Sequence, residues 1–449
     1  MDANHRLTAG RGALSRREAV KQLLLMGGAW VFAAGCRKKA GGPGALSRVA
    51  ITLWVLEENV ESPDIYQQIA EEFMAANPGV EIRVERRAND AYKEALRLAI
   101  NTSVAPDGYF SWGGIGLGGF YVRAHGAVPL TAYYEKYGWA ARFTPAVLAG
   151  TFFDGVQYGI PFRVRAMGLY FRKDVFAAAG IDEKPSTYEL LLTVCKKLLA
   201  AGYTPLGMGG KNGWMLMRLT DSLFEKNCGA KVHDALRALE ADWSAEPGVT
   251  AAYAQLKQWM DAGYLSADFL GVDPISVRTS VYRGKAAMMY EGDWMVDYLR
   301  DDGMKLEEYD FFPFPTETGR LSFFTEMFFI GSTSRQAETV ARFYDFWTSP
   351  ATQTRHAGKF GAISPTVGIQ LPANTPAQVK TWQETVTQYS ATYGPADQAL
   401  PLEIVGSYLR VQAAVVSGAL KPEAAGASMQ ADITAYKKRN GTGAPAKPA

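Results

Sequence analysis

The 449-residue sequence contains few of the residue patterns on which enzymes depend. It has only three cysteines and four histidines, and the histidines are scattered along the chain. It contains no G-x-S-x-G nucleophile elbow, no P-loop and no H-E-x-x-H zinc motif. Three cysteines are too few for a disulfide scaffold or a thiolate metal cluster. The sequence therefore predicts a protein that is not an enzyme and that holds neither a metal nor a cofactor.

Long hydrophobic runs and an excess of one charge are also missing from most of the chain. No stretch of 18 or more uncharged apolar residues follows the N-terminal leader, so we expect no membrane span there. Residues 1–48 hold nine basic and two acidic residues, a net charge of +7, which leaves 38 basic and 43 acidic residues, or −5, for the rest. A slightly acidic body argues against a nucleic-acid binder, because such proteins neutralise phosphates with lysine and arginine.

The first residues have the pattern of an export signal. A basic segment is followed by the apolar run Leu23–Ala34 and by small residues directly before Cys36. This junction resembles the lipobox of bacterial lipoproteins, in which the cysteine carries lipid, and Ser15–Lys21 resembles a twin-arginine signal. The alternative for Cys36 is an ordinary buried thiol. We expect a signal peptide over 1–35 and a lipidated, flexible tether over 36–48, hence an extracytoplasmic protein anchored to a membrane at the cell surface or in the periplasm.

The two other cysteines do not define a motif. Cys195 lies in an apolar helical run, which favours a buried free thiol. A disulfide between Cys195 and Cys228 remains an alternative, because export would permit it and sequence cannot supply the geometry.

The first part of the body has the alternation of an α/β fold. Val49–Leu56 is an apolar run typical of a buried strand. Ser62 and Pro63 are placed to begin a helix, as N-cap and first turn, and apolar and charged residues alternate over Val80–Glu85 as in a half-buried strand. Strand, helix and strand in this order predict a parallel pair.

The pattern restarts after Pro161. We expect a strand at Gly168–Phe171, a helix opened by the capping box Ser186–Glu189, and a strand at Lys285–Tyr290. A body of roughly 400 residues exceeds the size of a single core, so two lobes are expected. Four tryptophans on apolar helical faces are assigned to the core: Trp243, Trp259, Trp347 and Trp382.

One glycine motif has two interpretations. Gly114–Gly119 fits G-x-G-x-x-G and follows a predicted strand. It lies on the third strand instead of the first, and Trp112 would intrude where a pyrophosphate must approach the backbone. We therefore favour a glycine-rich loop at a ligand cleft over a dinucleotide site.

Tryptophans and acids follow several of the predicted strands. A tryptophan beside glycines and acids is a candidate platform for a sugar, because the apolar face of a pyranose packs on indole while carboxylates and arginines bind its hydroxyls. Carboxylate pairs are also what glycoside hydrolysis needs, and acids in such loops can equally cap helices or face water. The candidates are Trp54, Trp112, Trp214 and Trp294, with the pairs Glu57 and Glu58, and Glu291 and Asp293.

Taken together, these marks resemble the family 1 extracellular solute-binding proteins of carbohydrate ABC importers, the group that is similar to maltose-binding protein. The segments that carry the resemblance follow one another in the family's order: Ile51–Trp54, Phe73–Ile82, Ala105–Trp112, Asp154–Pro161, Gly168–Phe176, Gly284–Trp294 and Phe346–Pro350.

The resemblance implies a two-lobed α/β fold with a ligand cleft between the lobes, each lobe being a mostly parallel sheet flanked by helices. Hinge crossings are then expected near Pro161–Arg165, Ser322–Phe328 and Gly361–Pro365. The implied boundaries give an N-terminal lobe of 49–163 and 325–361, a C-terminal lobe of 164–324 and 362–439, and a disordered tail at 440–449.

The resemblance also implies site residues. Trp112 and Trp294 match stacking positions of the family, Glu57 and Glu58 match acids after the first strand, and Arg163 and Arg165 follow the segment that lines the cleft. Arg165 can instead pair with an acid across the hinge. Relatives often carry glycines where this chain has Phe323 and Phe324, so we expect this aromatic pair to narrow the cleft, with Phe324 as a site residue.

The function implied is a monomeric receptor that binds an oligosaccharide by lobe closure and delivers it to an ABC permease with its ATPase. Three alternatives remain: a secreted carboxylate-based glycoside-active enzyme, a receptor for a polyol such as a glycerol phosphodiester, and an adhesive lipoprotein without a small ligand.

Overall fold

The computed structural model describes residues 48–57, 64–266, 268–359, 363–389 and 391–440, which belong to one compact unit. The predicted signal peptide, the lipidation site Cys36, almost all of the tether and the tail beyond Asn440 lie outside these residues, as does Glu58.

The first part of the unit is the expected strand–helix–strand crossover. Strands β1 (Val49–Leu56) and β2 (Val80–Arg87) pair in parallel, and β1 pairs in parallel with β3 (Gly108–Trp112) on its other side. Helix α2 (Ile65–Ala76) joins β1 to β2 and buries its apolar face. The predicted cap is corrected: α2 begins after Asp64, whose carboxylate accepts a hydrogen bond from the Tyr66 amide.

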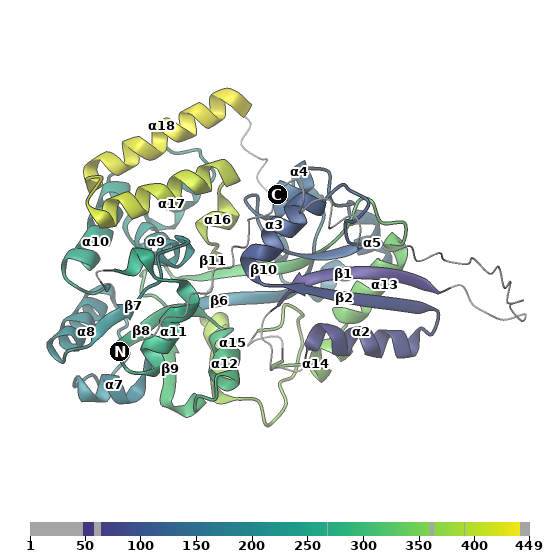
Figure 1. The fold of residues 1–449 in the computed structure, drawn as a ribbon, viewed down its shortest axis with the longest axis horizontal. Coiled ribbons are helices and arrows are strands. Elements are labelled where there is room, and N and C mark those ends of the chain that lie inside the picture. The colour runs from purple at the N-terminus through teal and green to yellow at the C-terminus, as the bar shows by residue number, and fades with distance from the viewer. Residues whose placement is uncertain (1–47, 58–63, 267, 360–362, 390, 441–449) are drawn as a thin grey trace, which may run out of the picture. The chain divides into compact units, whose positions relative to one another are not determined.

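Two long strands connect this part to the second part of the unit (Figure 1). The first half of β6 (Ile160–Arg172) pairs antiparallel with β10 (Arg320–Ile330), and the second half of β10 pairs with β3. The second half of β6 pairs with β8 (Ala286–Gly292) and β9 (Tyr309–Phe312). Both strands therefore begin in one half of the molecule and end in the other.

The two-lobed α/β class is confirmed, with a mixed sheet of order β2-β1-β3-β10-β6-β8-β7. The antiparallel pairings arise where β6 and β10 cross between the halves, whereas β1, β2 and β3 and the pair β7 (Thr204–Gly207) and β8 are parallel. The predicted hinge ranges 161–165 and 322–328 lie in β6 and β10, whereas the third, 361–365, begins outside the described residues. The hinge positions and the exact lobe boundaries remain predictions.

Helices cover the sheet on the second half. Helix α9 (Trp214–Arg237) is kinked at Gly229 and packs with α10 (Pro247–Asp261), and the last two helices, α17 (Leu402–Ser417) and α18 (Pro422–Asn440), lie against them (Figure 1). The other elements are α3 (Asn89–Ala99), α4 (Gly118–Arg123), α5 (Thr131–Tyr137), η1 (Trp139–Arg142), α6 (Pro145–Ala149), β4 (Phe152–Phe153), β5 (Val156–Gln157), α7 (Lys173–Ala178), α8 (Tyr188–Ala200), η2 (Phe269–Gly271), α11 (Pro274–Tyr282), α12 (Met295–Asp301), η3 (Leu306–Glu308), α13 (Ala337–Trp347), α14 (Pro350–Arg355), α15 (Ala377–Gln388), β11 (Ala391–Tyr393) and α16 (Ala396–Ala399).

The core tryptophans and the cysteines are placed clearly. Trp243, Trp259, Trp347 and Trp382 are all buried, as predicted from their helical faces. Cys195 is a buried free thiol and Cys228 is also free, so the disulfide alternative is wrong. The predicted capping box is also corrected, because Thr187 and not Ser186 accepts the hydrogen bond at the start of α8.

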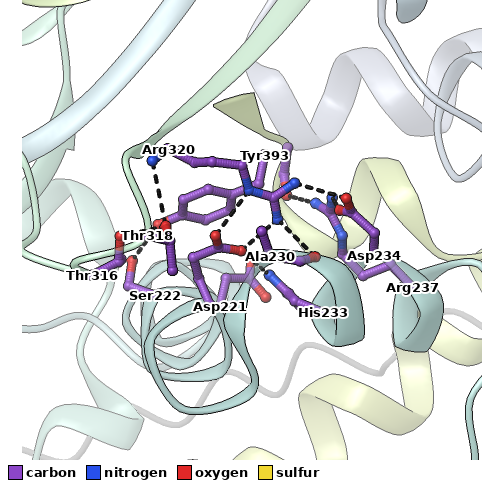
Figure 2. A network of polar contacts seen from close by, with 12 residues as sticks. Asp221, Ser222, Ala230, His233, Asp234, Arg237, Thr316, Thr318, Arg320 and Tyr393 are labelled. Carbon is purple, nitrogen blue, oxygen red and sulfur yellow. Dashed lines mark hydrogen bonds and ion pairs between the residues drawn. The ribbon is translucent and has the colours of Figure 1, made fainter. Parts of the chain in front are cut away.

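A buried polar cluster holds α9 to β10 (Figure 2). The Glu225 carboxylate accepts hydrogen bonds from Arg320 Nε at 2.9 Å and Nη2 at 2.6 Å, and lies 2.6 Å from His233 Nδ1. Arg320 also donates to Asp234 at 2.8 Å. Burial alone would raise the pKa of Glu225, but hydrogen bonds from His233 and Arg320 hold it well below its usual range. The cluster therefore fixes both sides of the Gly229 kink onto the crossing strand.

Within the described ranges, none of the helices has the length and apolar character needed to cross a membrane.

Candidate functional site

A cavity of about 300 Å³ lies between the two halves of the molecule. The first half contributes residues that follow β1 and β2 and the start of α3, and the second half contributes the starts of α9, α11 and α12. The crossing strands β6 and β10 supply its floor, through Arg165, Phe324 and Glu326. The size is that of a small-molecule site.

Four aromatic side chains that line this cavity stand at the ends of elements or on a crossing strand. Trp112 is the last residue of β3, Trp214 is the first residue of α9, and Trp294 directly precedes α12. Phe324 lies on β10, and its ring centroid is 6.1 Å from that of Trp294. Their contributions from both halves give a ligand apolar surfaces on opposite sides of one cavity.

The sequence Glu291-Gly292-Asp293-Trp294 folds so that it fixes its own tryptophan. Trp294 Nε1 donates to Glu291 Oε2 at 2.8 Å. The indole folds back over Gly292, where an added Cβ would lie 2.0 Å from the ring, so only glycine fits at this position. The ring is therefore held in place before any ligand arrives, which lowers the entropic cost of binding.

Arg218 supports the same wall. Its Nη1 donates to Glu291 Oε2 at 2.7 Å and to the Tyr290 carbonyl at 2.9 Å. Its guanidinium carbon lies 4.5 Å from the ring centroid of Trp214 and 5.1 Å from that of Trp294. Arg218 thus links the two indoles through cation–π contacts and holds the carboxylate between them.

A buried ion cluster lies where the crossing strands meet. Glu326 of β10 accepts hydrogen bonds from Arg163, and from Arg165 Nε at 3.2 Å. Arg165 Nη1 also donates to Asp293 Oδ2 at 3.1 Å, and Asp293 Oδ1 accepts from the Ala166 amide at 3.3 Å. Four charged groups buried together must be paired to be tolerated, so this cluster is part of the framework beneath the cavity.

Apart from Glu58, which lies outside the described residues, the predicted site residues divide into two groups. Seven line the cavity: Glu57, Trp112, Arg165, Trp214, Glu291, Trp294 and Phe324. Three do not line it: Trp54, Arg163 and Asp293.

The three residues outside the lining have structural surroundings. Trp54 lies in a strand buried on both faces, and Arg87 covers its ring at 3.7 Å from the centroid. Arg163 and Asp293 are enclosed in the ion cluster, with exposed fractions of 1% and 0%. For these three residues the structure favours a framework role over the direct contact expected from the sequence.

Several lining residues were missed by sequence reasoning. Arg218 lies one turn into a helix that was not predicted, and Asn212 precedes that helix. The start of α11 contributes Asp273 and Arg278, and α12 contributes Asp297 and Asp301. For Asp297 and Asp301 the available signal is that α12 begins directly after strand β8, since the ends of strands in an α/β sheet are where such folds bind ligands.

The glycine motif is packed instead of open. The Gly116 amide donates to the Gln398 carbonyl at 2.9 Å, and a Cβ added to Gly116 would lie 2.1 Å from the Asp397 carbonyl oxygen. These glycines therefore permit close backbone contact between the two halves beside the cavity. The Gly116 amide is thus not available to a pyrophosphate, which disfavours the dinucleotide alternative.

The cavity carries an excess of acid. Eight acidic and five basic side chains line it. Four of the bases contact carboxylates: Arg86 with Asp64, Arg165 with Glu326 and Asp293, Arg218 with Glu291, and Arg278 with Asp302. An anionic ligand would therefore meet net repulsion. In the described part of the chain, no group of three or more His, Cys, Asp or Glu side chains is placed to hold a metal ion.

A cavity of this kind, formed between two α/β halves joined by crossing strands, defines a class of binding proteins that hold a ligand between lobes. The sequence matches the family described as bacterial extracellular solute-binding protein over residues 58–354. The chain belongs to this family, whose members act outside the cytoplasm as binding proteins.

Curated relatives match over part of their length. A binding protein of Brucella abortus (strain 2308) is 22% identical over 257 residues, 57% of this chain and 61% of the relative. A maltotriose-binding protein of Pyrococcus abyssi (strain GE5 / Orsay) is 23% identical over 248 residues, 54% of this chain and 49% of the relative. The chain thus spans about three-fifths of the length of the first of these relatives and half of the second.

Solved structures match more completely. A chitin oligosaccharide binding protein superposes with a TM-score of 0.76 at 21% identity, covering 87% of this chain and 99% of that one. A binding protein in complex with raffinose gives a TM-score of 0.69 at 16% identity, covering 87% and 100%. At these identities the likeness establishes the two-lobed fold.

Proposed function

We propose that this protein is the substrate-binding receptor of an ABC importer and that it captures an oligosaccharide between its lobes. The observation that carries the proposal is the aromatic cavity between the halves, with Trp112 from one half and Trp214 and Trp294 from the other. Indoles stack on the apolar faces of sugar rings, and the surrounding carboxylates and arginines bind hydroxyls. Relatives whose names state a sugar ligand, such as maltotriose, support this choice.

Capture would proceed by closure of the two halves around the ligand. A ligand that contacts both halves favours the closed state by its differential affinity. The crossing strands β6 and β10 are the segments that would bend, and the buried ion cluster would keep them in register. The closed receptor, acting as a monomer, would then dock on the permease, which works with its ATPase.

The charge of the cavity separates the remaining ligand classes. The acid excess favours a neutral sugar over a glycerol phosphodiester or another anion. An enzyme is also disfavoured, because Glu291 is engaged by Arg218 and Trp294 and Asp293 by Arg165. These carboxylates are held as framework and are poorly placed to exchange protons with a glycosidic oxygen.

A thermal-shift panel tests this function. Maltotriose, raffinose, chitotriose, xylotriose, trigalacturonate and glycerophosphocholine would each be added to the protein, with chromatography of the sugar afterwards. We expect a neutral oligosaccharide to raise the melting temperature and to be recovered intact. Cleavage of the sugar would favour the glycosidase, and a response confined to the anions would contradict a neutral-sugar receptor.

The attachment to the membrane is proposed separately. Cys36 would carry lipid after cleavage of the signal peptide, so Cys36→Ser should move the protein from the membrane fraction to the soluble fraction of cells that express it. A Cys228→Ser variant, which changes a cysteine within the folded unit, is the matched control. An unchanged membrane fraction for Cys36→Ser would contradict the anchor.

A further inference from the structure

A second, smaller cavity of about 90 Å³ adjoins the aromatic cavity. The two cavities share five lining residues: Asn89, Trp112, Trp214, Arg218 and Phe324. The smaller one extends past the tryptophans toward α3 on one side and α16 on the other, where Lys93 and Asp397 line it. We call it the side cavity. Since one water needs about 15 Å³ measured in this way, it has room for roughly six waters, or for the hydroxylated edge of one sugar ring.

An acceptor in the side cavity has no side-chain hydrogen-bond partner. Asp397 Oδ1 is buried and, among the described residues, no side chain donates to it. Burial raises the pKa of Asp397. The charges of Lys93 and Arg218, and hydrogen bonds from the backbone amides of Asp397 and Gln398, oppose this rise only in part. Buried polar atoms are nearly always satisfied in folded proteins, so this oxygen is available to a donor that enters the cavity, either water or a hydroxyl of a ligand that displaces it.

The two charged residues of the side cavity have opposite signs. Lys93 Nζ lies 4.6 Å from the centroid of the Trp112 ring. An anion placed here would face Asp397, and a cation would face Lys93 and Arg218, so neither is favoured. A sugar hydroxyl suits both residues, because it can accept a hydrogen bond from the ammonium and donate one to the carboxylate.

We propose that the side cavity is an additional sugar subsite in which neighbouring hydroxyls of one terminal ring bridge Lys93 and Asp397. This proposal rests on the proposed function. It adds polar contacts for the terminal sugar ring, beyond the tryptophans on which the other rings stack. Trp112 and Trp214 line both cavities and would contact the rings on either side of the junction. The ligand would then be a neutral oligosaccharide whose terminal ring, the one in the side cavity, has adjacent free hydroxyls.

Calorimetric titration of two variants tests the subsite, with the neutral sugar that stabilises the wild type most in the panel. Asp397→Ala should weaken binding by about 10-fold or more, and Lys93→Met, which keeps the aliphatic stem, by about 5-fold. Glu94→Gln, an exposed neighbour on the same helix, is the control and should bind like the wild type. The double variant should lose less than the product of the two single losses, because both residues act on the same hydroxyls.

The melting temperature without sugar distinguishes a ligand contact from a structural residue. Because the Asp397 Oδ1 that Asp397→Ala removes has no side-chain partner, the melting temperature of the variant should stay within about 1 °C of that of the wild type while its affinity falls. A fall in both quantities would make Asp397 a structural residue and overturn the assignment. Wild-type affinity in both single variants, with binding lost in Trp294→Ala, would show that the sugar does not enter the side cavity. A wild type that binds no sugar would overturn the proposed function itself.

Discussion

Replacing Glu326 by glutamine perturbs the strand crossing most directly. Glu326 is 4% exposed and lies between two arginines of β6, which are 1% and 4% exposed. The substitution keeps the shape of the side chain but removes the negative charge that compensates Arg163 and Arg165. Breaking a buried ion pair by removing one partner costs about 3–5 kcal/mol, because the remaining buried charge loses an opposite charge that compensated it.

This loss of stability predicts a lower melting temperature. Unfolding entropy is about 2.1 cal/mol/K per residue, or roughly 0.8 kcal/mol/K for the about 380 described residues. Glu326→Gln should therefore lower the melting temperature by about 4–6 °C in differential scanning calorimetry. The control is Glu94→Gln, which breaks an exposed pair with Arg97 and should shift the melting temperature by less than about 1 °C. If Glu326→Gln also melted within 1 °C of the wild type, the ion cluster would not be a stabilising part of the crossing.

Two further predictions concern the aromatic wall and the buried histidine. Trp112→Ala and Trp294→Ala should each reduce sugar affinity by about 10-fold or more in calorimetric titration. Near-native affinity in both variants would show that stacking on these indoles does not contribute to binding. Burial, together with the charge of Arg237, lowers the pKa of His233 from 6.5 to about 4. Since the unfolded chain takes up this proton at the higher pH, the wild type should lose up to about 3 kcal/mol of stability between pH 6.5 and 4 relative to His233→Asn, measured by urea unfolding. Parallel stability curves for the two proteins would contradict this.

The sequence was most informative where local patterns determine structure. The strand Val49–Leu56 was predicted with its correct ends, and the parallel pairing of β1 and β2 followed from the helix between them. The tryptophans after strands were found because the ends of β3 and β8 are marked by glycines and acids. Trp54 shows the limit of that rule. The second half of β1 is buried on both faces, so a tryptophan near the end of this strand is enclosed in the core and does not reach the cavity.

Contacts between distant residues could not be predicted in the same way. Arg165 and Asp293 are separated by 128 positions and Arg163 and Glu326 by 163, and only the antiparallel pairing of the crossing strands and the fold around them brings them together. Arg218 carries no local mark, because its role depends on two tryptophans that come from different elements. Asp397 was passed over for the same reason: its oxygen without a side-chain partner is visible only when α16 is placed beside α3.

The central claim is that a neutral oligosaccharide binds between the two lobes. Isothermal titration calorimetry of the panel sugars against the wild-type protein, at several temperatures, tests it most directly. We expect one site per chain for at least one neutral oligosaccharide, with a negative heat-capacity change from the apolar ring faces buried on the indoles. The absence of binding heat for every neutral sugar at all temperatures, together with saturable binding of trigalacturonate or glycerophosphocholine, would contradict it.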